Sequence, residues 1–293
     1  MIERGTSRGN KASRRRRLSL CAAAVVGMVV TVLPGAASAA AASQAPFPYP
    51  EDYAALGDSY SSGFGTGVYD PASGTCDRSP LSYPSLWVAE HHPASFEFAA
   101  CSGAKTADVL ATQISALRPG TDLVTITVGG NDAGFAPVIE TCTVASSDRT
   151  CFAAVDAAEA FERTVLPGRL ARTYAAIRRA TPQARVIVLG YPRLFDLAPS
   201  CADPFVPNQT RRAKLNHGAD VLDSVISEVA SQQSGFSFAD VRDRFAGHGV
   251  CSAEPWINDP SVPSTVGPYH PTQAGYRDGY LPALDAATAR DAA

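Results

Sequence analysis

The chain has 293 residues, of which 45% are hydrophobic and 18% charged, so it holds enough apolar side chains for a substantial core. A predicted export signal at residues 1–39 carries seven of its 25 Lys and Arg residues and one of its 28 Asp and Glu residues, which leaves 18 basic and 27 acidic residues and a net charge of −9. This acidic balance argues against a protein that binds nucleic acid or an anionic membrane.

The N-terminus has the three parts of a secretory signal peptide. Four arginines at 14–17 precede an apolar run over residues 18–33, and an Ala-Ser-Ala tripeptide at 37–39 is typical of a cleavage site. The apolar run is too short for a stable membrane anchor. The arginines fit either general secretory or twin-arginine export. We therefore expect a secreted protein with three parts, a signal peptide at 1–39, a short leader at 40–50 and a single domain at 51–293.

The remaining chain alternates between strand and helix patterns. Apolar runs that end in glycine predict buried parallel strands at 53–57, 123–129 and 186–190. Shorter strands are expected at 96–98 and 236–238, and helices at 83–91, 106–117, 152–180 and 207–231. The Pro-Gly pair at 167–168 should interrupt the third helix. This alternation predicts a three-layer α/β/α sandwich around a parallel sheet of about five strands.

Three predicted strands are followed by residues that suit chemistry, and the carboxyl ends of parallel strands are where such sheets bind ligands. Ser59 follows the first strand in the run Gly-Asp-Ser-Tyr, where the glycine permits a tight turn that presents the hydroxyl group. Gly103 enters a predicted helix, and its amide could donate to a developing negative charge. Asn131, in the run Gly-Gly-Asn-Asp, offers a side-chain amide. Each pattern alone also fits an ordinary turn or helix cap.

A serine nucleophile needs a base, and the chain has five histidines. His270 is the best placed, because it lies in a proline-bounded loop before the final helical segment. His248, between two glycines, is the main rival. His217 and the pair at 91–92 lie in or at the end of predicted helices.

Loss of Cys21 with the signal would leave six of the seven cysteines, an even number that predicts three disulfides in an exported protein. Many pairings are permitted. The simplest is sequential, with Cys76 bonded to Cys101, Cys142 to Cys151 and Cys201 to Cys251. The sequence has no Cys-x-x-Cys motif and no Cys and His cluster with metal-ligand spacing, so we expect neither a metal nor a cofactor.

Ser59, Gly103, Asn131 and His270 together resemble the four ordered blocks of the SGNH (GDSL) hydrolase family, and the resemblance extends from Tyr53 to about Tyr280. The six cysteines resemble those of its secreted actinobacterial lipases, esterases and phospholipases. The resemblance implies a flavodoxin-like fold, Ser59 as nucleophile and His270 as general base and then acid. It also implies an oxyanion hole made of the Ser59 amide, the Gly103 amide and the Asn131 side chain.

One position departs from the family pattern. Most members carry an acid three residues before the histidine, where this chain has Gly267. Some secreted members use a backbone carbonyl instead, so we expect the Gly267 carbonyl to orient His270 in a Ser–His dyad. Asp259 is the alternative, as a more distant acid that would complete a triad.

The expected function is therefore that of a secreted, monomeric serine carboxylic-ester hydrolase, a lipase, esterase or phospholipase that acts through an acyl-enzyme on Ser59. Its substrate would be a small ester or a lipid, with at most transient contact with lipid interfaces. A carbohydrate O-deacetylase on the same fold is one alternative. A catalytically inactive secreted binding protein on this scaffold is the other. The Cys76–Cys101 bridge would hold the loop that carries Gly103, or would only stabilise a long loop.

Overall fold

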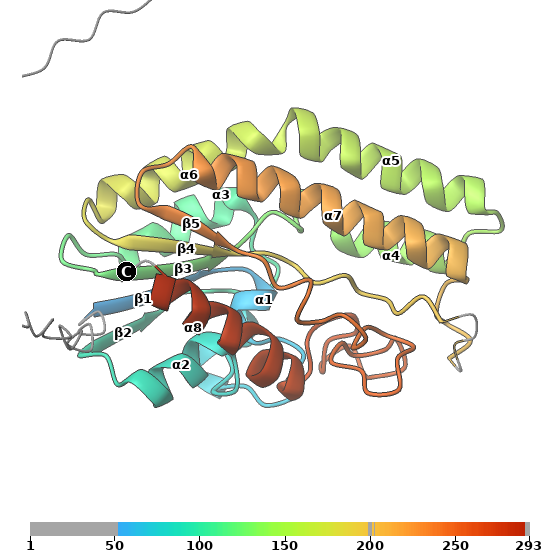
Figure 1. Cartoon of the computed structure of the whole chain (residues 1–293), viewed down its shortest axis with the longest axis horizontal. Helices are drawn as coiled ribbons and strands as arrows, with labels where there is room; N and C mark the ends of the chain where they lie inside the picture. The colour runs from blue at the N-terminus through green and yellow to red at the C-terminus, as the bar shows by residue number, and fades with distance from the viewer. Residues whose placement is uncertain (1–51, 199–200, 202, 291–293) are drawn as a thin grey trace, which may run out of the picture. The chain divides into compact units, whose positions relative to one another are not determined.

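Five short parallel strands form the centre of the computed structural model, which describes residues 52–198, 201 and 203–290 (Figure 1). The strands are β1 (Asp52–Gly57), β2 (Ser95–Phe98), β3 (Leu123–Thr127), β4 (Arg185–Leu189) and β5 (Phe236–Ala239). Their order in the sheet is β2-β1-β3-β4-β5. The described residues all belong to one compact unit. The predicted signal peptide (1–39) and leader (40–50) lie outside them.

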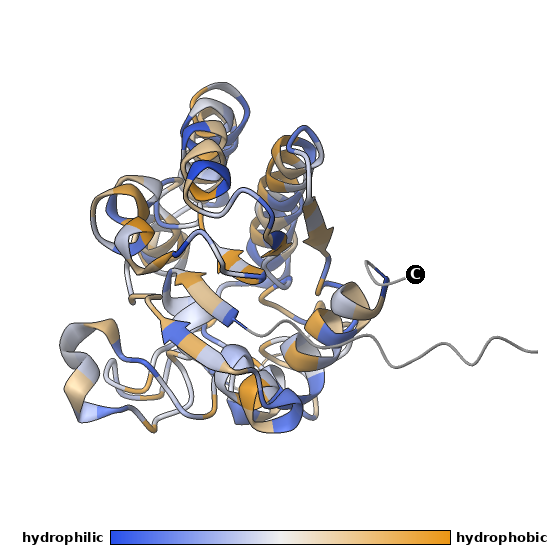
Figure 2. Ribbon diagram, turned by 90° about the vertical axis from the view of Figure 1, so that its left-hand side faces the viewer, coloured by the Kyte–Doolittle hydropathy of each residue, from blue (hydrophilic) through white to orange (hydrophobic). Residues whose placement is uncertain are grey.

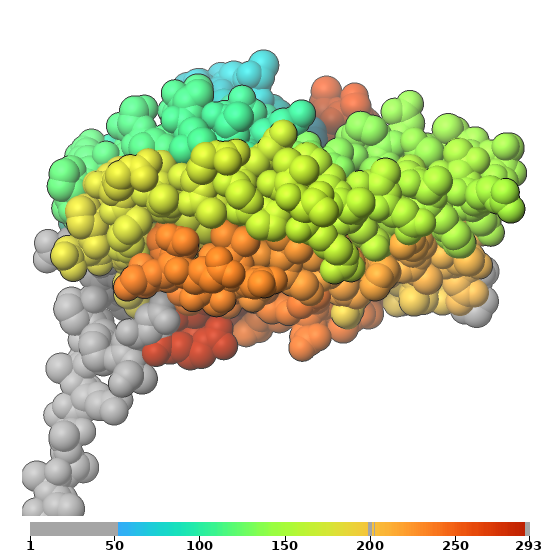
Figure 3. All heavy atoms as spheres, turned by 90° about the horizontal axis from the view of Figure 1, so that it is seen from above, coloured from blue at the N-terminus to red at the C-terminus, as the bar shows by residue number. Residues whose placement is uncertain are grey.

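Helices cover both faces of the sheet, which explains why its three central strands, β1, β3 and β4, are apolar runs instead of alternating patterns. Every residue of β3 is buried. The helices α2 (Tyr83–His91) and α8 (Leu281–Arg290) pack on one face, while α6 (Leu166–Ala180) and α7 (Gln209–Ser231) lie on the other with the long α5 (Figures 1 and 2). The view from above shows α5 and α6 end to end in one row, with α7 running beside them (Figure 3). The predicted three-layer sandwich is confirmed.

The long predicted helix at 152–180 is in fact two helices, α5 (Asp148–Thr164) and α6, separated at Val165. The break precedes Pro167, which occupies the first turn of α6. A proline is tolerated there because the first turn of a helix leaves its N–H groups without intrahelical partners. The start of α5 lies before the predicted one because the Ser147 side chain accepts a hydrogen bond from the Thr150 N–H and caps the helix.

Two helical segments differ from the sequence-based expectation. The segment predicted at 106–117 is a composite of a short α-helix, α3 (Thr106–Asp108), a π-helical turn (Val109–Gln113) and a 3-10 turn (Ile114–Ala116). The helix α4 (Phe135–Val144) was not predicted. Its N-cap is Gly134, with a φ of 82°, and no side chain caps it, so the usual start signal is missing from the sequence.

The strand order creates a switch point between β1 and β3. From β1 the chain crosses to β2 on one side, whereas β3 leads to β4 and β5 on the other. Connections therefore diverge at the carboxyl ends of β1 and β3, which leaves a crevice where ligands bind in open sheets of this order. Within the described part of the chain, no helix combines the length and apolar character that a membrane crossing requires.

The described residues include three disulfides, Cys76–Cys101, Cys142–Cys151 and Cys201–Cys251, which confirms the sequential pairing. The second joins α4 to the first turn of α5. The third joins the segment after β4 to the segment after β5. The second bridge therefore links two consecutive helices, while the third links two irregular segments.

Candidate active site

Ser59 is the first residue of α1 (Ser59–Ser62), a one-turn helix that begins directly behind β1. The turn needs glycine at position 57. Gly57 has a φ of 119°, and a Cβ atom there would lie 2.4 Å from the Thr127 carbonyl oxygen. The side chain of Gln113 holds the same residue, accepting from the Gly57 N–H at 2.8 Å and donating to its carbonyl at 2.9 Å. The nucleophile candidate thus stands on a rigid strand-to-helix turn.

His270 reaches Ser59 from the loop that precedes α8. Its Nε2 atom lies 2.8 Å from the Ser59 Oγ atom, and its Nδ1 atom lies 2.9 Å from the Pro268 carbonyl oxygen. A carbonyl oxygen only accepts hydrogen bonds, so in the neutral ring Nδ1 carries the proton and the Nε2 lone pair faces the serine hydroxyl. This is the tautomer that a general base requires.

The expectation that the Gly267 carbonyl orients His270 is wrong, because the Pro268 carbonyl does so. Gly267 has a φ of 98°, and its carbonyl oxygen lies 3.4 Å from Nδ2 of Asn258. Tyr269 also has a positive φ, 60°, which turns the chain so that the imidazole meets the carbonyl two residues earlier. The Asp259 carboxylate accepts from the N–H and the hydroxyl of Ser261.

Asn258 holds the histidine loop in place. Its N–H donates to the His270 carbonyl and its own carbonyl accepts from the Tyr269 N–H, both at 2.9 Å. The Asn258 side chain donates to the Gly65 carbonyl at 2.8 Å, which ties this loop to the segment behind Ser59. The approach is so close that a Cβ atom at Gly65 would lie 2.3 Å from the Pro271 carbonyl oxygen.

The imidazole of His270 stands among aromatic rings. The ring centroids of Phe64 and Tyr60 lie 4.9 Å and 5.0 Å from that of His270, and the ring of Phe135 lies at 6.0 Å. Burial in this setting disfavours the charged imidazolium and lowers the pKa of His270 to about 4, although the hydrogen bond to Pro268 acts in the opposite direction. The ring is therefore neutral at physiological pH.

Gly103 lies in the loop that follows β2, and this loop is fastened to the turn that carries Ser59. The Cys101 N–H donates to the Gly57 carbonyl at 3.0 Å, and the Ser102 N–H donates to the Cys76 carbonyl at 3.1 Å. Together with the Cys76–Cys101 disulfide, these bonds restrain the residues on the N-terminal side of Gly103. Gly103 has a φ of 77°, and nothing lies within 4 Å of the position that a Cβ atom would take, so the loop is open at this residue.

Asn131 follows β3 and donates from Nδ2 to the Ala104 carbonyl at 3.1 Å, which places its side-chain amide beside the Gly103 loop. A primary amide carries two hydrogens, so the second remains for another acceptor. The next residue, Asp132, accepts from the Thr106 N–H and hydroxyl at 2.8 Å and 2.7 Å and pairs with Arg169 at 3.0 Å. Asp132 thereby joins the loops behind β2 and β3.

Tyr191, at the end of β4, connects the two central loops. Its hydroxyl donates to the Asp58 carboxylate at 2.5 Å and accepts from the Gly130 N–H at 3.1 Å. Burial raises the pKa of the Asp58 carboxyl to about 7, although the hydrogen bonds from Tyr191 and Tyr60 oppose the shift. The Tyr191 hydroxyl therefore holds both Asp58, which precedes the nucleophile, and Gly130, which precedes Asn131.

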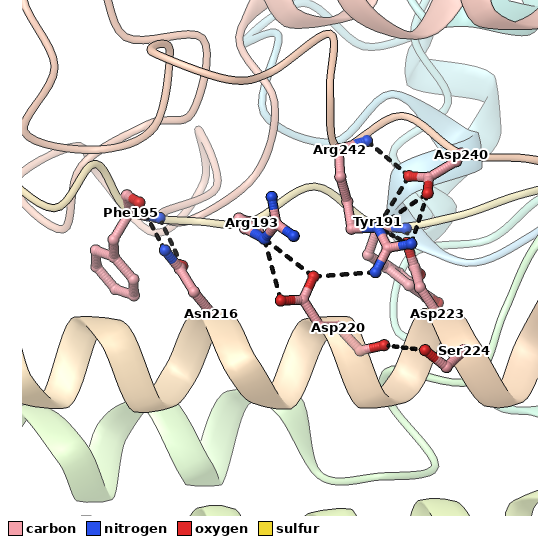
Figure 4. A network of polar contacts seen from close by, with 9 residues as sticks. All are labelled: Tyr191, Arg193, Phe195, Asn216, Asp220, Asp223, Ser224, Asp240 and Arg242. Atoms are coloured by element: carbon pink, nitrogen blue, oxygen red, sulfur yellow. Dashed lines mark hydrogen bonds and ion pairs between the residues drawn. The ribbon is translucent and has the colours of Figure 1, made fainter.

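Tyr191 is also held through its backbone, by a polar network that includes residues of α7 (Figure 4). The Tyr191 N–H donates to the Asp223 carboxylate of α7 at 2.9 Å, and Arg242 lies 3.5 Å from that carboxylate. Arg242 also pairs with Asp220, one helical turn before Asp223. These contacts tie the end of β4 to α7 and to the segment after β5, which restricts the backbone that presents the phenol.

An apolar pocket opens beside the dyad, between α4, α5, α7 and the carboxyl ends of β3 and β4, with about 590 Å³ of empty space that includes its open mouth. Tyr60, next to Ser59, and Gly130, next to Asn131, line its near end. The rest is mostly aliphatic, and its main contributors are Val138, Ile139, Val155, Leu194, Leu215 and Leu222. Such a lining suits an alkyl chain.

Among the described residues, Glu90, His91 and Asp285 have side-chain ligand atoms within 4.8 Å of one another. The His91 Nε2 atom lies within hydrogen-bond distance of the Asp285 carboxylate, at 2.9 Å, so a hydrogen bond between α2 and α8 explains why these two side chains meet. Of the rival histidines, His248 stacks on Trp256 with a centroid distance of 3.8 Å and bonds the Glu254 carbonyl. His217 pairs weakly with Glu159. Only His270 meets Ser59 in the described part of the chain.

Sequence reasoning missed several residues that hold the site. Asp132 belongs to the same short motif as Asn131 and could have been found there. Gln113, Tyr191 and Asn258 carry no such signal, because each acts across a long stretch of chain.

The chain is similar in sequence to a family of lipases and to individual lipases from Streptomyces. The model of the GDSL-like lipase/acylhydrolase family matches residues 55–277. A lipase from Streptomyces rimosus is 46% identical over 272 residues, which cover 93% of this chain and 100% of the relative. Lipase 1 from Streptomyces coelicolor is 44% identical over 274 residues, which cover 94% of this chain and 99% of the relative.

Two solved structures share the fold at similar identity. The crystal structure of an extracellular lipase from Streptomyces rimosus has a TM-score of 0.76 and 47% identity, and the match covers 80% of this chain and 99% of that one. The crystal structure of phospholipase A1 from Streptomyces albidoflavus NA297 has a TM-score of 0.77 and 46% identity, with 81% and 99% coverage.

Proposed function

Because the chain belongs to the GDSL-like lipase/acylhydrolase family, we propose that it is a secreted serine hydrolase that cleaves carboxylic esters through an acyl-enzyme on Ser59. The observation that carries the proposal is the 2.8 Å contact between the Ser59 hydroxyl and Nε2 of His270, with Nδ1 held by the Pro268 carbonyl. This arrangement activates a serine hydroxyl without a carboxylate.

In the first half of the reaction, His270 Nε2 takes the Ser59 proton while the serine oxygen attacks the ester carbonyl carbon. The carbonyl oxygen becomes an oxyanion, for which the donors are the Ser59 N–H, the Gly103 N–H and Nδ2 of Asn131. The imidazolium then returns the proton to the departing alcohol, and the acyl group stays on Ser59. In the second half, water replaces the alcohol. Nε2 removes a proton from the water as its oxygen attacks the acyl carbon. When this second intermediate collapses, the bond from the acyl carbon to Ser59 Oγ breaks, the imidazolium returns the proton to Oγ, and the acid is released.

The apolar pocket supports esters with apolar acyl chains as substrates, including the acylglycerols and phospholipids of lipase and phospholipase chemistry. Two of its lining residues, Tyr60 and Gly130, are the sequence neighbours of Ser59 and Asn131, which supports the pocket as the acyl site. Ser59, Gly103, Asn131 and His270 all come from one chain, so the proposed enzyme needs no residue of a second copy and can act as a monomer. Three disulfides and an extracellular relative support secretion.

Labelling by a fluorophosphonate probe and hydrolysis of nitrophenyl esters test this proposal together. We expect the probe to label the wild-type chain and not Ser59→Ala, and kcat/KM to rise from acetate toward longer acyl chains as more alkyl surface enters the pocket. Absence of Ser59-dependent labelling in folded protein would contradict the enzyme proposal and favour a binding protein. A strict preference for acetate would instead favour a carbohydrate deacetylase.

The pH dependence of the reaction tests the role of His270. Only the neutral imidazole can accept the serine proton, and burial lowers its pKa from 6.5 to about 4. We therefore expect kcat/KM for a short soluble ester to persist below pH 6.5 and to fall only as the pH approaches about 4. If kcat/KM fell already near pH 6.5 or above while the protein stayed folded, the buried environment inferred for His270 would be wrong.

Stability must be followed over the same pH range. The folded-state pKa of His270 is lower than its unfolded value, so the unfolded chain binds the extra proton between about pH 6.5 and 4. The contribution of neutral His270 to the free energy of unfolding is thus complete above this window and is lost as the pH falls through it. Circular dichroism at each pH separates loss of the base from loss of the fold.

A further inference from the structure

Glu162 is the acidic residue among those that line the apolar pocket. It lies on α5 at a spacing that puts it on the same helix face as Val155 and Ala158, and all three line the pocket. Its relative exposure is 4%, and its Oε2 atom has no hydrogen-bond partner among the described residues. Nor does the described part of the chain supply an ion pair for it, although Arg163 is its neighbour in sequence.

An unpartnered carboxyl oxygen is costly in such a place, because a buried polar atom without a hydrogen bond loses its hydration and gains nothing. The mechanism derived above uses Ser59, His270, Gly103 and Asn131, and it leaves Glu162 without a role. The pocket is the space that the substrate would fill. We therefore look to the substrate for the hydrogen-bond partner of the Glu162 carboxyl group.

The chemistry of the carboxyl group indicates what that partner is. Burial and, to a smaller extent, the nearby Glu159 carboxylate raise the pKa of Glu162 to about 7 against the opposing effect of Arg163, so both protonation states are populated near neutral pH. A hydroxyl group suits both states, since it donates to a carboxylate and accepts from a carboxylic acid. An ammonium group suits only the ionised state. The aliphatic lining around Glu162 requires that the rest of the ligand be an alkyl chain.

We propose that Glu162 is a specificity-determining residue that selects esters whose acyl chain carries a hydroxyl group, through a hydrogen bond formed inside the pocket. This inference rests on the proposed ester hydrolysis and on the pocket as the acyl site. According to the inference, the hydroxyl group that Glu162 binds lies on the acyl chain of the ester and not on its alcohol. An unsubstituted chain would still bind, but it would leave the carboxyl group without a partner.

The test compares nitrophenyl esters of one chain length in which a single hydroxyl is moved carbon by carbon along the acyl chain, with the unsubstituted ester as reference. For the wild-type protein we expect at least one hydroxylated ester to exceed the reference in kcat/KM by about tenfold, mainly through KM. Glu162→Met, of similar length and without a hydrogen-bonding carboxyl, should lose this preference. Glu162→Gln, whose amide both donates and accepts, should keep most of it.

Glu159→Gln is the matched control, because it removes a carboxylate from the same helix. Glu159 pairs with Lys214 and does not line the pocket, so the preference should remain. Equal kcat/KM for all esters in the wild type, or an unchanged preference in Glu162→Met, would overturn the inference. A Glu162-dependent preference for glyceryl over propyl esters of the same acid would also overturn it, since the hydroxyl would then belong to the alcohol. Failure of the wild type to hydrolyse even the reference ester would instead refute the proposed function.

Discussion

Replacement of His270 by alanine is expected to lower kcat for nitrophenyl esters by about 10⁴-fold or more, with the fold intact. Without the imidazole, the Ser59 hydroxyl keeps its proton and is a poor nucleophile, and no acid remains to protonate the leaving alcohol. Ser59→Ala should cause a loss of similar size. The double variant should lose little more than either single one, because the two residues act as a unit.

Asp259→Asn provides the matched control for this prediction. The Asp259 carboxylate accepts hydrogen bonds from Ser261, while Nδ1 of His270 already bonds the Pro268 carbonyl. We therefore expect Asp259→Asn to keep kcat within about tenfold of the wild type. A collapse of activity in this variant, with an unchanged circular dichroism spectrum, would mean that a carboxylate completes a triad during turnover.

Replacement of Asn131 by alanine should reduce kcat by about 10²–10³-fold and change KM little. The reason is that a donor to the oxyanion acts mainly in the transition state, whereas the ground-state ester gains less from it. The variant also loses the contact between Nδ2 and the Ala104 carbonyl. The Gly103 loop keeps its bonds to Gly57 and Cys76, so it should stay in place.

Asn208→Ala is the control variant, because it removes an asparagine side chain that caps a helix and is not expected to take part in catalysis. Asn208 caps α7 by accepting from the Arg211 N–H at 3.0 Å, so its removal should cost about 1 kcal/mol of stability and leave kcat unchanged. A variant of Asn131 in which KM rises at constant kcat would show that Asn131 binds the substrate uniformly and is not an oxyanion donor.

The position of the site follows from the strand order. Ser59 and Asn131 come after β1 and β3, which are neighbours in the sheet, so adjacent strand ends present them together. Tyr191, from the end of the next strand, supports both loops through its hydroxyl. His270 comes from a long loop that is held by backbone and side-chain bonds of Asn258. The nucleophile and Asn131 thus rest on the sheet, whereas the base depends on loop packing.

Local patterns in the sequence were sufficient for the sheet and for the candidate site. Apolar runs with terminal glycines predicted the three central strands, β1, β3 and β4, because a strand buried on both faces must be apolar throughout. Ser59 and Asn131 were found because they follow those runs directly. Helix boundaries were less accurate, since α4 lacks a capping side chain and the break before α6 depends on how Pro167 is accommodated in a first turn.

The sequence by itself determined the fold class, the candidate site residues and the simplest disulfide pairing, all of which depend on residue type and order along the chain. Only the tertiary structure decided which carbonyl holds His270, because the choice between Gly267 and Pro268 depends on backbone angles that neither residue reveals. It also decided the support from Tyr191 and the burial of Glu162 in the pocket. These depend on distances between residues far apart in the chain, which exist only after the helices have packed on the sheet.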